Sequence, residues 1–200
     1  HDSLDIKFYD PDRRALIPID NSLGRGVHIP RRLQRRVRQA PYEVTLDRDF
    51  TAVIDACAAP SDQRTDTWIN KDIRQLYIAL HKMGFAHSIE VWSDGALIGG
   101  LYGVALRAAF FGESMFSRKS DASKIALVHL MARLRHGNFL LLDAQFTNDH
   151  LQQFGVTEID RSEFQGRLAE ALASDGDLHF DTPSAALVMP YLDQLAKHQA

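Results

Sequence analysis

The chain has 200 residues, enough for one domain with a sizeable core, and its apolar fraction of 45% and charged fraction of 24% are ordinary for a globular protein. No apolar run approaches the roughly 20 residues that cross a bilayer, so we expect no membrane association. The single cysteine, Cys57, excludes an intramolecular disulfide and favours a cytoplasmic protein. The net charge of −3 excludes general attraction to polyanions, so a nucleic-acid partner needs a local basic cluster.

The first half of the chain predicts an irregular start and then mainly helices. Residues 1–20 carry no clear period and contain the turn signal Asp10-Pro11-Asp12. Pro30 suits the first turn of a short basic helix that ends before Pro41. The expected elements are, in order, a helix over Arg31–Arg38, a strand over Tyr42–Leu46, a helix over Asp49–Ala58, a polar loop over Pro60–Thr67 and a helix over Ile69–Met83.

The second half predicts a strand meander and then alternating helices and strands. The expected strands of the meander are Ser88–Trp92, Leu97–Leu106 and Ala108–Phe116. The elements expected after it are a helix over Ser120–Arg135, a strand over Phe139–Phe146, a helix over Asn148–Phe154, a strand over Val156–Ile159, a helix over Ser162–Leu172 and a helical tail from Pro183. This order predicts an α+β fold with a mostly antiparallel sheet and flanking helices.

Two of the expected strands combine a carboxylate with large apolar side chains. Alternation along a strand places Glu113 and Met115 on one face of the first, and Leu141, Asp143 and Gln145 on one face of the second. A carboxylate among apolar groups is costly to bury unless it is paired. The composition therefore suits a pocket that holds an apolar side chain and performs polar chemistry beside it.

A basic cluster surrounds the first expected helix. Its members are Arg25, Arg31, Arg32, Arg35, Arg36 and Arg38. Such a cluster can bind phosphates even on a protein with a net negative charge. The same pattern is also typical of a helix face that is simply exposed to solvent. The residues alone leave both interpretations open.

The longest motifs of the chain lie between Trp92 and Glu170. They are Gly99–Ala105, Gly112-Glu113-Ser114-Met115-Phe116-Ser117-Arg118, Asp121–Lys124, Leu142-Asp143-Ala144-Gln145-Phe146, Asn148–His150 and Phe154-Gly155. Upstream motifs are His28–Leu33, Thr67-Trp68-Ile69 and Ala86–Trp92. In this order, from about Asp10 to about Arg167, they resemble the leucyl/phenylalanyl-tRNA–protein transferase family.

This resemblance implies a fold and a reaction. The fold is an acetyltransferase-like (GNAT-like) domain over residues 21–200, with residues 1–20 as the remnant of a small N-terminal domain. Leu or Phe passes from aminoacyl-tRNA to the α-amine of a protein that begins with Arg or Lys, and the product is marked for degradation. Neither a cofactor nor a metal is implied. Because the chain begins at His1, we expect it to lack a segment whose aromatic residue helps the family hold the terminal adenosine.

The resemblance also implies site residues. Gln145 positions the attacking amine, Asp143 tunes Gln145 or accepts a proton, and Glu113 binds the amine or the first side chain of the acceptor. The amino-acid pocket comprises Leu101, Phe110, Met115, Leu127 and Leu142, with Leu130 as a weaker candidate. The tRNA-binding residues are Trp68, which stacks on adenine, and Arg31, Arg32, Arg35 and Arg36.

Each assignment has a structural alternative. Glu113 pairs with Arg118 or Lys124, the apolar residues are plain core, and Trp68 is a hydrophobic lid. Strict alternation also places Phe110 opposite Met115, unless Gly112 marks a β-bulge, and it places Leu142 opposite Asp143. For the chain as a whole, the alternatives are an acyl-CoA-dependent N-acetyltransferase and a non-catalytic tRNA-binding module.

Overall fold

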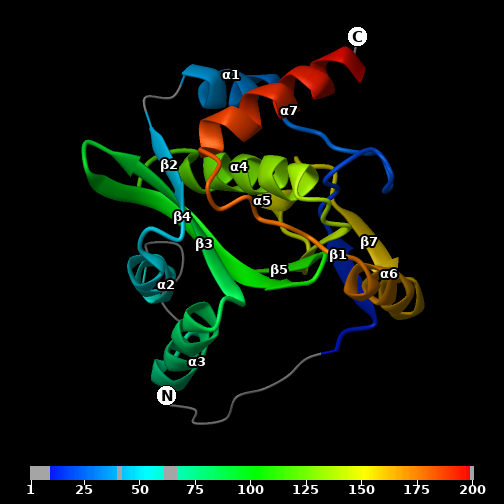
Figure 1. The fold of residues 1–200 in the computed structure, drawn as a ribbon, viewed down its shortest axis with the longest axis horizontal. Coiled ribbons are helices and arrows are strands. Elements are labelled where there is room, and N and C mark those ends of the chain that lie inside the picture. Colours follow the sequence, from blue (N-terminus) through cyan, green and yellow to red (C-terminus); the bar gives the residue numbers. More distant parts are fainter. Residues whose placement is uncertain (1–9, 40–41, 61–66, 199–200) are drawn as a thin grey trace.

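The computed structural model describes residues 10–39, 42–60 and 67–198, and these form an open seven-stranded sheet with helices on both faces (Figure 1). The strands are β1 (Arg13–Leu16), β2 (Glu43–Leu46), β3 (Ala86–Ser93), β4 (Ala96–Leu106), β5 (Ala109–Ser117), β6 (Leu141–Gln145) and β7 (Thr157–Asp160). The helices are α1 (Arg31–Gln39), α2 (Phe50–Ala58), α3 (Lys71–Lys82), α4 (Ala122–His136), α5 (Asp149–Gln152), α6 (Arg161–Ala173) and α7 (Ser184–His198).

The sheet has the strand order β2-β3-β4-β5-β6-β1-β7. Among the described strands, β5 and β6 form the one parallel pair, and all other neighbours are antiparallel. A parallel pair needs a long crossover, and α4 supplies it. The expected α+β fold with a mostly antiparallel sheet and flanking helices is therefore confirmed. Most of the expected polar loop at Pro60–Thr67 lies outside the described residues.

Strand β1 corrects the expectation that residues 1–20 are irregular. Arg13–Leu16 lies between β6 and β7 and pairs with both in antiparallel register. The strand is only four residues long and begins with two arginines, so it shows no apolar alternation. The assignment of residues 1–20 to the remnant of a separate domain stays a prediction, although β1 is paired within the sheet of the remaining chain.

Helix α4 is the centre of one layer. It packs on β3, β4 and β5 and is covered by α7 and α1, so it is buried on almost every side and not only along a stripe (Figure 1). A Cβ at Gly99 of β4 would lie 2.4 Å from the Ala122 Cβ, so glycine lets the first turn of α4 approach the sheet. The buried guanidinium of Arg133 on α4 donates to the carbonyls of Leu178 and Thr182, which fastens the segment before α7.

The opposite layer consists of α2 and α3, with α6 near the other edge of the sheet (Figure 1). Side-chain caps fix where α2 and α3 begin. Asp49 accepts from the Ala52 amide at 2.9 Å, and Asn70 accepts from the Ile73 amide at 2.9 Å. The cap at Asn70 explains why α3 begins at Lys71 and not at the expected Ile69.

His129 on α4 makes the stability of the fold sensitive to acid. Burial lowers its pKa from 6.5 to about 4, so the folded chain resists protonation there while the unfolded chain accepts it. Stability is then lost as pH falls from about 6.5 towards 4, by about 2 kcal/mol between pH 7.5 and pH 5. We expect His129→Gln to flatten this part of the stability profile in urea unfolding at several pH values. Parallel pH profiles for the two proteins would contradict the assignment.

Candidate active site

The candidate site lies where β5 and β6 separate. Their parallel pairing ends at Phe111 and Asp143, whereas β5 continues to Ser117. Opposite β4, Gly103 pairs with Gly112 and Tyr102 pairs with Ser114, so Glu113 is the extra residue of a β-bulge. Of the two alternatives left open at Gly112, strict alternation or a β-bulge, the structure shows the bulge. It brings Glu113 to the gap between the diverging strands.

Gln145, the last residue of β6, lies between two carboxylates. Its Nε2 donates to Glu113 Oε2 at 3.3 Å and, at 3.4 Å, to the carbonyl of Gly112. Its backbone N–H donates to Asp143 Oδ1 at 2.8 Å. Gln145 adopts φ +63°, a left-handed conformation that non-glycine residues rarely occupy. The hydrogen bond that the Gln145 N–H donates to Asp143 stabilises this conformation and so fixes the direction of the Gln145 side chain.

Asp143 is fully buried, and its cation comes from β1. Arg14 donates to Asp143 Oδ2, and the guanidinium carbon of Arg14 lies 4.7 Å from the centre of the Phe164 ring on α6. The sequence alone does not reveal Arg14 as a partner, because the short strand that carries it shows no apolar alternation. A signal was nevertheless present, since a carboxylate in an apolar strand requires a buried partner.

Glu113 contacts Tyr77 of helix α3, and not Arg118 or Lys124. Burial raises the pKa of Glu113, and hydrogen bonds from Tyr77 and Gln145 offset part of that rise. Burial and the Glu113 charge likewise raise the pKa of Tyr77. Lys124 pairs with Asp121 at 3.4 Å, and Arg118 donates to the carbonyl of Leu97 at 3.0 Å. The alternative that Glu113 pairs with Arg118 or Lys124 is therefore wrong.

Trp68 lies beside this polar group. The residue is 47% exposed, and its ring meets Tyr77 edge-to-face at 6.3 Å between centroids. Tyr77 in turn contacts Glu113, so the structure joins Trp68 to Gln145 through two side chains. An exposed indole next to a polar centre is available for stacking, whereas a lid would be buried.

The expected pocket residues gather on the α4 face of the sheet. Leu101, Phe110, Leu127 and Leu142 are buried in one apolar cluster with Leu130, and Met115 packs against it half-exposed. The bulge places Phe110 and Met115 on the same face, while Leu142 and Asp143 face opposite sides, as alternation predicts. The apolar cluster thus lies on the α4 face at the divergence of β5 and β6, and Asp143 points to the other face, where it meets Arg14. Membership of an amino-acid pocket stays a prediction for all five residues.

Met115 is the member of the cluster whose role is easiest to test. It lies opposite Leu101 on β4 and two residues from Glu113. If it lines the pocket, Met115→Ala enlarges the pocket and changes the ratio of Phe to Leu transfer by about tenfold, the effect of one or two methylene groups. Initial rates with the two charged tRNAs measure this ratio. Equal losses for both amino acids in a folded variant would make Met115 a supporting residue.

The arginines of α1 form an exposed surface on the other layer. Arg31, Arg32, Arg35 and Arg36 face solvent, while Leu33 and Val37 are buried. Helix α1 packs on α4, whereas Trp68 precedes α3 on the opposite face of the sheet (Figure 1). The structure therefore does not bring the two groups of expected tRNA-binding residues together. A ligand that contacts both Trp68 and the arginines of α1 must therefore be large.

Two further properties of the described residues bear on the site. No cluster of three His, Cys, Asp or Glu side chains in residues 10–39, 42–60 and 67–198 is arranged to hold a metal ion. None of the helices in the described part of the chain combines the length and the apolarity of a membrane span.

The fold is an α+β domain, and its candidate site is an amide fixed between two carboxylates on the strands that also carry the apolar cluster. An amide fixed in this way has the geometry to orient a polar group. The family model described as leucyl/phenylalanyl-tRNA protein transferase matches residues 23–169. The chain belongs to this family of aminoacyltransferases.

Bacterial relatives with that same name are closely similar to the chain. The protein from Hyphomonas neptunium is 57% identical over 170 residues, which is 85% of this chain and 64% of the relative. The protein from Phenylobacterium zucineum is 56% identical, covering 85% of this chain and 75% of the relative. The protein from Rhodopseudomonas palustris strain TIE-1 is 51% identical, covering 91% and 80%. The chain thus spans between about two thirds and four fifths of these relatives.

Proposed function

We propose that this chain transfers Leu or Phe from aminoacyl-tRNA to the α-amine of proteins that begin with Arg or Lys, in the cytoplasm, and so marks them for degradation. The observation that carries the proposal is the fixed amide of Gln145, held by Asp143 and Glu113 where β5 and β6 diverge. Family membership favours this reaction over acyl-CoA-dependent acetylation and over tRNA binding alone.

The reaction is the aminolysis of an ester. The α-ammonium of the acceptor loses a proton, and its nitrogen attacks the ester carbonyl carbon. A C–N bond forms, the C–O bond to the terminal ribose breaks, and the ribose oxygen takes up a proton. Neither bond change needs a redox partner. The protein must orient the amine and provide for the two proton transfers.

Gln145 has the geometry to orient the amine. Its Nε2 is engaged by Glu113 and by the Gly112 carbonyl, so its Oε1 is the atom left to accept an N–H from the attacking amine. Asp143 holds the backbone of Gln145 and supplies a negative charge behind it. Glu113 provides the charge that attracts a cationic acceptor, either its α-ammonium or its first side chain. Burial raises the pKa of Glu113, which makes it a suitable temporary holder of a proton.

The apolar side of the divergence is the proposed site for the transferred side chain. An apolar pocket selects Leu or Phe over polar amino acids, but a single methylene group contributes only about 1–3 kcal/mol of discrimination. The terminal adenine is proposed to stack on Trp68, where base–aromatic stacking contributes about 1–3 kcal/mol. We also assign the domain to the acetyltransferase-like fold. The parallel pair β5–β6, joined by α4 and diverging at the site, supports that assignment.

A transfer assay with purified components tests the function. The chain is incubated with Phe-tRNA labelled in the amino acid and a peptide that begins with Arg, and label in the peptide is measured. We expect label in this peptide and in its Lys counterpart, and little in a peptide that begins with acetylated Arg, because the α-amine is blocked. Acetyl transfer from acetyl-CoA to the same peptide, or tRNA binding without transfer, would contradict the proposal.

The α1 arginines are proposed to bind phosphates of the tRNA. Neutralising Arg31, Arg35 and Arg36 with glutamine is expected to lower tRNA affinity and to flatten its salt dependence. The slope of log affinity against log salt should fall by roughly 0.9 for each lost contact to a duplex phosphate. Arg48→Gln, which removes an exposed ion pair with Glu43, is the control. An unchanged slope in the triple variant would make α1 a solvated face.

A further inference from the structure

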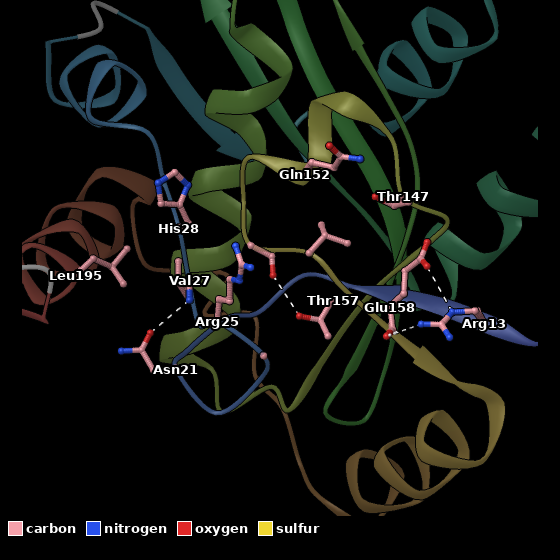
Figure 2. A pocket seen from close by; sticks show the side chains of 13 residues that line it. Arg13, Asn21, Arg25, Val27, His28, Thr147, Gln152, Thr157, Glu158 and Leu195 are labelled. Carbon is pink, nitrogen blue, oxygen red and sulfur yellow. Dashed lines mark hydrogen bonds and ion pairs between the residues drawn. The ribbon is translucent and has the colours of Figure 1, made fainter.

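A groove of about 1120 Å³ lies beside the candidate site (Figure 2). The function proposed above assigns no ligand to it. One wall is the segment from Asn21 to His28, and the other is the segment from Thr147 to Glu158, which includes α5 and the start of β7. Arg25 and Thr157 lie in its middle, His28 lies towards one end, and Thr147 lies towards the other (Figure 2).

The groove connects two places that already have proposed roles. Thr147 is two residues beyond Gln145, so their Cα atoms are at most about 7 Å apart. Ala15 on β1 is opposite both Gln145 and Glu158, which places Glu158 two strands from Gln145, about 10 Å away. At the other end, His28 is three residues before the first arginine of α1. The groove thus leads from the neighbourhood of Gln145 towards the arginine surface of α1.

The charge in the groove is mainly positive. Arg25 is exposed and has no side-chain hydrogen bond or ion pair with any described residue. Arg13 is neutralised by Glu158, with 3.4 Å between Nε and the carboxylate oxygen. His28 Nδ1 lies 2.6 Å from the carbonyl of Gln153 and therefore carries the proton, which leaves Nε2 for a ligand. Thr147 and Thr157 add hydroxyl groups that can bind ribose or phosphate oxygens.

We propose that this groove binds the single-stranded nucleotides that precede the terminal adenosine of aminoacyl-tRNA. The inference rests on the proposed function. With the ester at Gln145 and the adenine on Trp68, we place the 5′-phosphate of that adenosine at Thr147, because the groove begins there, two residues beyond Gln145. The strand must then run from Thr147 to the duplex on α1. The groove spans this route and offers Arg25 to the phosphates.

An acceptor polypeptide is the competing occupant, and the charges disfavour it. Acceptors that begin with Arg or Lys bring positive charge to the site, whereas the unpaired side chain in the groove is itself cationic. The continuity with the α1 arginines also favours a polyanion.

Donors of different length separate these possibilities. The phenylalanyl ester of adenosine alone, the same ester of the trinucleotide CCA, and Phe-tRNA are compared with one Arg-starting peptide. We expect the wild-type chain to use the CCA donor at a lower KM than the adenosine donor. Arg25→Glu should raise KM for the CCA donor and for Phe-tRNA by about tenfold and leave KM for the adenosine donor and for the peptide unchanged. Arg167→Glu, on exposed α6, is the matched control.

Binding of uncharged, 5′-labelled CCA tests the groove without any transfer. Arg25→Glu should weaken it and reduce its salt slope by roughly 0.7, the value for one single-strand phosphate contact. If the wild-type chain transfers no Phe, the proposed function fails, and this binding measurement still decides the groove. An increase in peptide KM with an unchanged preference for CCA would assign the groove to the acceptor. No effect on either substrate would show that the groove binds neither. Both results would overturn the proposal.

Discussion

Replacing Asp143 with asparagine is expected to lower Phe transfer by about 10²–10⁴-fold, the range of general acid–base contributions. The change keeps the shape of the side chain and removes the charge. Without that charge, the backbone N–H of Gln145 loses its ionised acceptor and Arg14 loses its counterion. The left-handed conformation of Gln145 is then held less firmly, and its amide spends less time aimed at the amine.

Binding of charged tRNA should change little in Asp143→Asn, because phosphates and adenine are held by other residues. The measurement is single-turnover transfer at several pH values, together with tRNA affinity. Asp193→Asn is a matched control, since it removes the same kind of charge from an exposed ion pair with Arg38 on the far layer. Near-normal transfer by Asp143→Asn at every pH would make Asp143 structural. Catalysis would then consist mainly of bringing the substrates together.

Much of the sheet and part of the site could be predicted because they depend on local sequence. The meander of β3, β4 and β5 follows from three strand-forming apolar segments and from the tight turn at Asp94 and Gly95. The bulge beside Gly112 follows from a glycine inside a strand. The opposite orientation of Leu142 and Asp143 needs only the period of a strand.

The remainder depends on contacts between residues far apart in the sequence. Arg14 meets Asp143 across 129 positions, and the contact between Tyr77 and Glu113 joins helix α3 to strand β5. No local pattern encodes either partner. The left-handed conformation of Gln145 is equally hidden, since it arises from the hydrogen bond to Asp143 and not from the propensity of glutamine.

The same long-range dependence decides how the proposed tRNA-binding residues are arranged. Trp68 and the arginines of α1 were grouped by chemistry, and the fold puts them on opposite faces of the sheet (Figure 1). Chemical type predicts what a residue can bind. Only the packing of α1 on α4 and of α3 on β3 decides which residues bind together.

Replacing Arg14 with methionine is expected to have the largest effect on stability. Methionine fills much of the arginine volume and still packs on Phe164, but it leaves the buried carboxylate of Asp143 without a cation. Removing one partner of a buried ion pair costs about 3–5 kcal/mol. We therefore expect the free energy of unfolding of Arg14→Met, measured in urea, to fall by that amount, and Phe transfer to fall with it.

The double variant Arg14→Met/Asp143→Asn separates the structural role of the pair from the catalytic one. With neither charge present, no uncompensated ion is buried, so most of the lost stability should return. Transfer should stay as low as in Asp143→Asn alone, because the carboxylate that orders Gln145 is still missing. If the double variant regained activity together with stability, the pair would serve only to hold β1 against β6. If it regained neither, an uncompensated buried charge would not be the cause of the lost stability.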